Sequence, residues 1–200
     1  MRKIIPFLVG ILLMGAPLAC MAQVKYSRGL IFGGNYNTAN WEPEPAGQMS
    51  GRLRFSFGGL LNINLSKEIQ LEGDLLVNWW AVNVKDVTDN FYNLWVVSIP
   101  VLIKGTIPAE RAAPFIGIGP EFGWVLSNTI TIGPEGTPED LEDQKSTTIA
   151  LTFCAGVDIE AVSGTITPEV RYSLGLTDLS KDTTTKNKHN QWLFLLGIKW

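Results

Sequence analysis

Hydrophobic and polar residues alternate along most of this chain with a period of two. The alternation is clearest between residues 52 and 80, where two long runs flank a short polar turn at Ser66 and Lys67. In the first run most odd positions are apolar, whereas most even positions are arginine, serine, asparagine or glycine. Successive side chains of a strand point to opposite faces, so this stretch predicts a hairpin with one apolar face and one polar face.

The same pattern, with turn-forming residues between the runs, predicts eight strands. They cover residues 26–36, 51–65, 68–82, 92–105, 113–126, 147–160, 164–176 and 189–200. Connections are short at 66–67 and 161–163, medium at 106–112, and long at 37–50, 83–91, 127–146 and 177–188. Alternating short and long connections are typical of outer-membrane barrels. The sequence therefore predicts an all-β fold, an eight-stranded antiparallel up-and-down transmembrane β-barrel.

The residues that this alternation assigns to the outer face, from Leu30 in the first predicted strand to Trp200 in the last, form a set that contains no charged residue. A water-soluble barrel would place ions on that face and keep apolar residues inside. The pattern therefore favours a barrel that faces lipid. A soluble periplasmic ligand-binding barrel is the alternative, and cell fractionation would separate the two.

Aromatic residues on the outward face indicate where the membrane interfaces lie. Five of them fall near the ends of strands that lead into long connections, and one is at the opposite end. Amphipathic rings prefer these interfaces, so we expect two aromatic belts. The membrane-interface aromatics are Tyr36, Trp79, Trp95, Trp124 and Trp192 on the outer side, and Trp200 on the periplasmic side.

Charges of both signs occupy inward positions. An eight-stranded barrel is just wide enough for side chains to fill its interior, and buried charges must be paired. We therefore expect a lumen closed by an ion-pair network, with a narrow pore or proton path as the alternative. The residues of the expected network are Arg54, Glu72, Asp74, Lys104, Glu121, Asp158, Glu160, Glu169, Arg171 and Lys199.

Three prolines, Pro100, Pro120 and Pro168, fall inside predicted strands. Proline cannot donate a hydrogen bond to the ladder, and a closed barrel has no edge strand to accommodate it. The sequence therefore predicts β-bulges at these positions.

The amino terminus resembles a secretory signal. Arg2 and Lys3 precede an apolar run, and small residues at Cys20 and Ala22 precede Gln23. Residues 1–22 are thus predicted to be cleaved, leaving 23–200 as the barrel. The signal holds two of the 16 basic residues and none of the 19 acidic ones, so the remainder has a formal net charge of −5. This charge argues against a nucleic-acid partner.

Cleavage would leave Cys154 without a second cysteine, so no internal disulfide is expected. After residue 22 no run of 18 apolar residues occurs, which argues against a spanning helix but not against spanning strands. The acidic segment 134–144 and the lysine-containing segment 181–188 are expected to be solvated loops. Calcium binding by the first and contact of the second with lipopolysaccharide phosphates are the alternatives.

Catalytic chemistry has little support in the sequence. The single histidine is His189, which lies beside Lys188 and Asn190 and which the alternation assigns to the inward face, that is, it has inward parity. No G-x-S-x-G elbow is present. A hydrolase site needs a nucleophile, a base and an orienting acid within hydrogen-bond reach. We therefore expect no catalytic residue, no cofactor and no metal, and keep a lipid A-modifying hydrolase as an alternative.

Several segments resemble one known family. They are S-I-P-V-L-I-K at 98–104, P-F-I-G-I-G-P-E-F-G-W-V-L-S at 114–127, R-Y-S-L-G-L-T-D-L at 171–179, and a last strand that ends on an aromatic residue. Together they resemble the PorT-like outer-membrane β-barrel family common in Bacteroidota. The terminal G-I-K-W is similar to the signal by which the barrel-insertion machinery recognises its clients.

The sequence thus predicts a non-enzymatic outer-membrane protein with a structural or interaction role at the cell envelope. Its expected partners are outer-membrane lipid and lipopolysaccharide, the barrel-insertion machinery, and an envelope protein contacted by the long loops. A narrow passive channel for small solutes is the first alternative, to be separated by single-channel conductance.

Overall fold

The computed structural model describes residues 25–42, 49–84, 91–131, 139–140, 145–179 and 186–200. Within these ranges every regular element is a strand, and no helix there could cross a membrane. The strands are β1 (Lys25–Glu42), β2 (Met49–Asn64), β3 (Ile69–Val84), β4 (Phe91–Thr106), β5 (Ala112–Thr131), β6 (Glu139–Asp140), β7 (Thr147–Ala161), β8 (Gly164–Gly175) and β9 (Lys186–Lys199). The predicted signal at 1–22 and most of the loop segments 134–144 and 181–188 lie outside the described residues.

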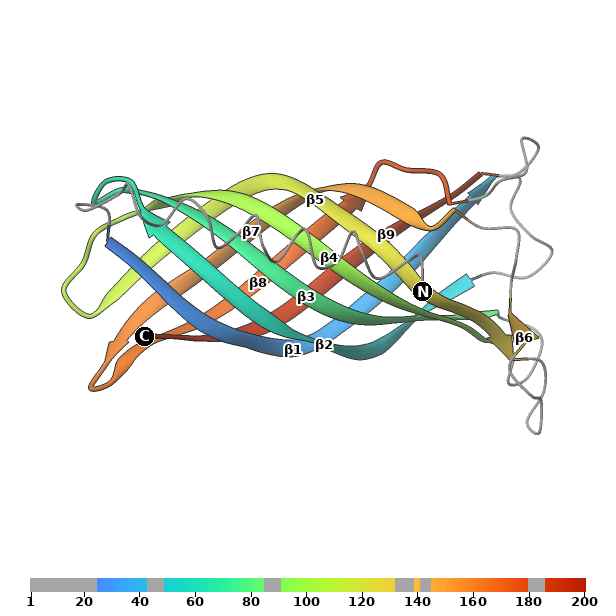
Figure 1. Ribbon diagram of the computed structural model, residues 1–200, viewed down its shortest axis with the longest axis horizontal. Helices are drawn as coiled ribbons and strands as arrows, with labels where there is room; N and C mark the ends of the chain where they lie inside the picture. The colour runs from blue at the N-terminus through green and yellow to red at the C-terminus, as the bar shows by residue number, and fades with distance from the viewer. Residues whose placement is uncertain (1–24, 43–48, 85–90, 132–138, 141–144, 180–185) are drawn as a thin grey trace, which may run out of the picture.

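Eight of these strands close into a barrel. Neighbours pair in the order β4-β3-β2-β1-β9-β8-β7-β5, and β4 also pairs with β5, so the sheet has no free edge along this ring. Every pairing is antiparallel. β6 is an addition outside the ring that pairs with the end of β5. The predicted eight-stranded antiparallel barrel is confirmed, and Figure 1 shows its strongly tilted strands.

The two ends of the barrel differ in their connections. Residues 65–68, 107–111 and 162–163 form short turns at the end where β1 begins and β9 finishes (Figure 1). The strand ends that lead into the longer connections lie at the opposite end, which we call the long-connection end. The turn at 162–163 depends on Gly164, which has φ +149°. A Cβ at this position would lie 2.1 Å from the carbonyl oxygen of Lys199. Only glycine therefore allows β8 to start so close to the end of β9.

The outer wall is apolar over the middle of the barrel. Large hydrophobic side chains with outward parity are exposed on every strand of the ring except β3. The described outward side chains of β3 are half-buried, apart from the exposed Ile69 at its start and the buried Ala81. Among the described residues, the exposed charged side chains lie near strand ends or in connections. They are Lys25, Arg28, Lys67, Glu68, Glu110, Arg111, Lys145, Glu160 and Lys188. An apolar band flanked by charged rims matches the hydrocarbon layer of a membrane.

The bulges predicted at the prolines are wrong. Residue pairing lapses beside Pro100 in the β3–β4 ladder and beside Pro168 in the β7–β8 ladder, but the register is the same on both sides of each gap. Pro120 pairs with Leu151 in the β5–β7 ladder, and in the β4–β5 ladder the pairing lapses at Pro120 without a change of register. A missing N–H removes one ladder bond and does not require an extra residue. The register shifts occur elsewhere, between Gly51 and Ser56 and beside Trp95.

Candidate functional site: the closed lumen

Five buried ionic side chains from β3, β4 and β8 meet inside the barrel. We refer to Glu72, Asp74, Lys104, Glu169 and Arg171 as the Arg171 cluster. Lys104 Nζ lies 2.5 Å from Glu72 Oε1 and 3.1 Å from Glu169 Oε2. Arg171 contacts all three carboxylates: it donates from Nε to Glu169 Oε1 at 2.7 Å, from Nη2 to Glu72 Oε1 at 3.0 Å, and from Nη1 to Asp74.

The position of these residues follows from strand alternation, because all five have inward parity on their strands. Each side chain is at most 1% exposed. Three carboxylates and two cations leave a formal charge of −1. Burying ions is costly unless geometry and hydrogen bonds compensate. Here each cation contacts at least two carboxylates, so loss of either cation would leave buried negative charge uncompensated.

Neutral groups complete the surroundings of the Arg171 cluster. Asn62 Nδ2 donates to Glu72 Oε2 at 3.3 Å and to Gln70 Oε1 at 2.9 Å. The Lys104 ammonium lies 4.4 Å from the centroid of the Phe115 ring, a cation–π contact.

Apolar side chains fill much of the remaining lumen. Two buried clusters lie beside the Arg171 cluster inside the barrel. One consists of Ile31, Leu60, Leu76, Leu193 and Leu195, and the other of Leu102, Phe115 and Cys154. A third, formed by Trp80, Leu94 and Val96, lies toward the long-connection end. The interior is therefore a mixture of ionic and apolar regions.

Asp158 and Lys199 form a separate pair at the short-turn end. Lys199 Nζ lies 2.6 Å from Asp158 Oδ1, and Thr167 Oγ1 donates to the same oxygen at 2.7 Å. The Asp158 side chain is 12% exposed, so this pair is closer to water than the Arg171 cluster.

Glu121 is buried without a cation. It is 6% exposed, and its Oε2 accepts hydrogen bonds from Thr152 Oγ1 at 2.6 Å and Ser173 Oγ at 2.7 Å. None of the ion pairs found among the described residues includes it. Glu121 thus has the predicted inward position, but its contacts there are neutral hydroxyl groups.

Two residues of the expected network lie outside it. The Arg54 guanidinium lies 4.5 Å from the centroid of the Trp79 ring and donates to the carbonyl oxygen of Leu53. Arg54 falls within the β2 register shift, where the ladder to β3 is interrupted and its side chain reaches an aromatic ring instead of a carboxylate. Glu160 is exposed near the end of β7, where the barrel interior meets solvent. The alternation of side chains along a strand could not show that Arg54 and Glu160 lie outside the network, because it indicates neither register shifts nor depth in the barrel.

A ladder of neutral side chains crosses β1 to β4. We refer to Asn35, Ser56, Asn78 and Ser98 as the asparagine–serine ladder. Asn35 Nδ2 donates to Ser56 Oγ at 2.7 Å, Ser56 Oγ donates to Asn78 Oδ1 at 2.6 Å, and Asn78 Nδ2 donates to Ser98 Oγ at 2.9 Å. The alternation of the sequence predicts no specific role for these four residues. The sequence alternation shows that these residues share the inward face. Which of them lie opposite one another on neighbouring strands depends on the strand register.

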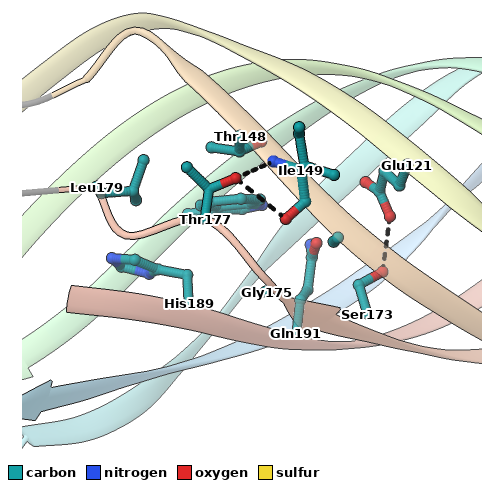
Figure 2. Close-up of a pocket in the computed structure, with 11 residues that line it drawn as sticks. Glu121, Thr148, Ile149, Ser173, Gly175, Thr177, Leu179, His189 and Gln191 are labelled. Carbon is teal, nitrogen blue, oxygen red and sulfur yellow. Dashed lines mark hydrogen bonds between the residues drawn. The ribbon is translucent and has the colours of Figure 1, made fainter. Parts of the chain in front are cut away.

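A small cavity lies inside the barrel, nearer to the long-connection end than the Arg171 cluster is. Its volume is about 20 Å³, and its lining includes Trp80, Glu121, Ser173, His189 and Gln191. We call it the outer cavity; Figure 2 shows Gln191 between Ser173 and Ile149, with His189 and Leu179 to one side. The His189 ring stacks on Trp80 with centroids 5.6 Å apart. The described residues contain no group of three or more histidine, cysteine or acidic side chains suited to a metal ion.

The structure also places the aromatic residues that were predicted to lie at the membrane interfaces. Trp79 and Trp95 pair across β3 and β4 and stack with centroids 5.5 Å apart. Tyr36 pairs with Trp192 across β1 and β9, and Trp192 also contacts the Tyr172 ring at 4.7 Å. Trp124 is exposed on β5 on the same side of the barrel, and Trp200 is exposed at the opposite end. Beyond these rings β1 continues from Tyr36 to Glu42, and β5 from Trp124 to Thr131.

Comparison with solved structures found several chains that are similar to this one. Neisserial surface protein A has a TM-score of 0.55 at 12% identity, with 88% of this chain and 97% of that chain covered. The attachment invasion locus protein Ail of Yersinia pestis has a TM-score of 0.48 at 10% identity, with 88% and 99% covered. The outer membrane protease OmpT from Escherichia coli has a TM-score of 0.42 at 8% identity, with 88% and 96% covered.

At 12% identity the likeness to Neisserial surface protein A concerns the fold alone. The search of curated proteins found no match. The sequence itself matches the family described as "Outer membrane protein beta-barrel domain" over residues 21–181. This match covers most of the barrel and agrees with its closed ring of strands and apolar wall. The chain therefore belongs to this family of outer-membrane β-barrel proteins.

Proposed function

We propose that this protein has a non-enzymatic structural or interaction role at the cell envelope, and that its surface performs this role while its lumen is closed. The observation that supports the proposal most strongly is the filled interior. The Arg171 cluster and the apolar side chains beside it occupy the lumen. The outer cavity has a volume of only about 20 Å³, which is room for one water-sized occupant.

Single-channel conductance separates this proposal from a passive channel. The purified barrel in planar bilayers is expected to give no discrete conductance steps, because an ion would have to cross a buried salt-bridge cluster. Regular steps in the wild-type protein would contradict the proposal and favour the channel. A porin of known conductance, reconstituted in the same bilayers, is the positive control.

The hydrolase alternative can be weighed on the geometry of the outer cavity. Ser173, His189 and Glu121 all line it, but Ser173 donates its hydroxyl proton to Glu121, and His189 stacks on Trp80. His189 Nδ1 has no hydrogen-bond partner. This is not the nucleophile–base–acid order of a catalytic triad. We expect His189→Ala to leave the lipid A profile of the host unchanged, and a changed profile would support the hydrolase.

The partner that we propose is lipopolysaccharide or another envelope protein at the long-connection end. The resemblance to PorT-like barrels supports an envelope role. The last strand of this chain ends on the aromatic residue Trp200, which supports uptake by the barrel-insertion machinery. Photo-crosslinking residues at Ser127, Lys145 and Lys188, all exposed at that end, are expected to capture the same partner in intact cells. Glu68, exposed in a short turn at the opposite end, is the matched control site and should capture a different set.

A further inference from the structure

The buried charges of the lumen do not balance. Among the described residues the buried carboxylates are Glu72, Asp74, Glu121 and Glu169, and the buried cations are Lys104, Arg171 and Lys199. Lys199 pairs with a fifth, partly buried carboxylate, Asp158. Four of the five carboxylates contact at least one of these cations directly. Glu121 contacts only the hydroxyl groups of Thr152 and Ser173. An ionised carboxylate this deeply buried requires a positive partner.

Gln191 provides a second, independent observation beside Glu121. Its side chain is 2% exposed, and neither its Oε1 nor its Nε2 has a hydrogen-bond partner. It lines the outer cavity together with Glu121, Thr148 and Ser173, and Figure 2 shows its side chain rising from β9 between Ser173 and Ile149. A buried amide with both polar atoms unsatisfied is unusual, because most such groups bind protein or an ordered ligand.

We propose that the outer cavity binds one monovalent cation, Na⁺ or K⁺. Its ligands are oxygen atoms: the Glu121 carboxylate, Gln191 Oε1, and the hydroxyl groups of Thr148 and Ser173. Hard cations prefer oxygen ligands of this kind. The ion balances the charge of Glu121 and satisfies the acceptor of Gln191 in one step.

Charge and size both favour a monovalent ion over a divalent one. Calcium sites usually combine six to eight oxygen ligands, several of them carboxylates, whereas the outer cavity has the single carboxylate of Glu121. Its volume of about 20 Å³ admits an ion or one water but not a hydrated divalent ion.

Two other occupants define what the test must separate. A single water would accept the Trp80 Nε1 proton, which has no partner in the structure, but it would leave the charge of Glu121 unbalanced. A proton on Glu121 would remove the charge but leave Gln191 without partners. Neither alternative requires an alkali-metal ion.

Thermal unfolding of the purified barrel in detergent tests the proposal. Measurements at one ionic strength compare NaCl and KCl with choline chloride, whose cation is too large for the cavity. The wild-type unfolding midpoint is expected to rise by roughly 5 °C, saturably, in at least one alkali salt. Glu121→Gln is expected to abolish this dependence, while Glu68→Gln in the exposed turn is expected to retain it. Equal midpoints for the wild type in all three salts would overturn the proposal.

Two further measurements guard against a variant that does not fold. Gln191→Leu removes a proposed ligand while keeping Glu121, and it is expected to weaken the response to the cation at least tenfold in concentration. Crystals of the wild type grown with Tl⁺ are expected to show an anomalous peak between Glu121 and Gln191. A water without anomalous signal at that place, or a peak only outside the lumen, would overturn the proposal.

Discussion

The Arg171 cluster and the asparagine–serine ladder lie in the same lumen but are stabilised differently. The cluster joins residues far apart in the chain, such as Asp74 and Arg171, through charge-assisted hydrogen bonds. The ladder joins Asn35, Ser56 and Asn78 on adjacent strands through short neutral side chains. A buried ionic cluster is strong only while its charges balance, whereas a neutral ladder loses one bond at a time.

Arg171→Met is expected to have the largest effect, because Glu72, Asp74 and Glu169 would then share the single cation Lys104. Removing one partner of a buried ion pair typically costs about 3–5 kcal/mol in the free energy of unfolding. Urea unfolding of the refolded barrel in detergent or lipid vesicles measures this cost. Arg28→Met, at an exposed position near the short-turn end, is the control. A loss as small as that of the control would show that the cluster contributes little to stability.

Asn78→Ala tests the ladder and is expected to cost less, roughly 2 kcal/mol. It removes the acceptor of Ser56 and the donor to Ser98, so two buried hydroxyl groups lose a partner. The double variant Asn78→Ala with Ser56→Ala is expected to be little worse than the single one, because the second change removes a group already left unsatisfied. Strict additivity in urea unfolding would argue that the ladder does not act as a connected network.

The rim pair is expected to show the smallest effect. A double-mutant cycle of Asp158→Asn and Lys199→Met should give a coupling energy of roughly 1 kcal/mol. Because Asp158 is partly exposed, added salt should screen this coupling, and 1 M salt should reduce it more than it reduces the cost of Arg171→Met. If the coupling is insensitive to salt, the rim pair is as isolated from water as the Arg171 cluster.

The sequence predicted the strands well because their signal is local. A period of two and the positions of turns depend only on neighbouring residues, so the ring of strands and the apolar wall could be derived. Strand ends were less accurate on the long-connection side, where β1 and β5 continue to Glu42 and Thr131. The alternation of apolar and polar residues ends before these positions, but the backbone pairing between neighbouring strands continues beyond it.

The contacts inside the lumen could not be derived in the same way. Which cation meets which carboxylate depends on strand tilt and register, which join Lys104 to Glu169 and Arg171 to Asp74 across the barrel. Arg54 was misplaced for the same reason, since the β2 register shift is not evident in the residues around it. Parity identified candidates for the lumen, and only the closed ring fixed their partners.

The seam between β1 and β9 has a consequence for folding. Its pairing runs from Gly29 opposite Lys199 to Glu42 opposite Lys186, so it joins the two ring strands most distant along the chain. Contacts of such high sequence separation form slowly, because a long loop must be closed before they contribute. We expect the hairpins to form first and the seam last. Until that moment the nascent sheet has two open edges, each a template for pairing with another chain.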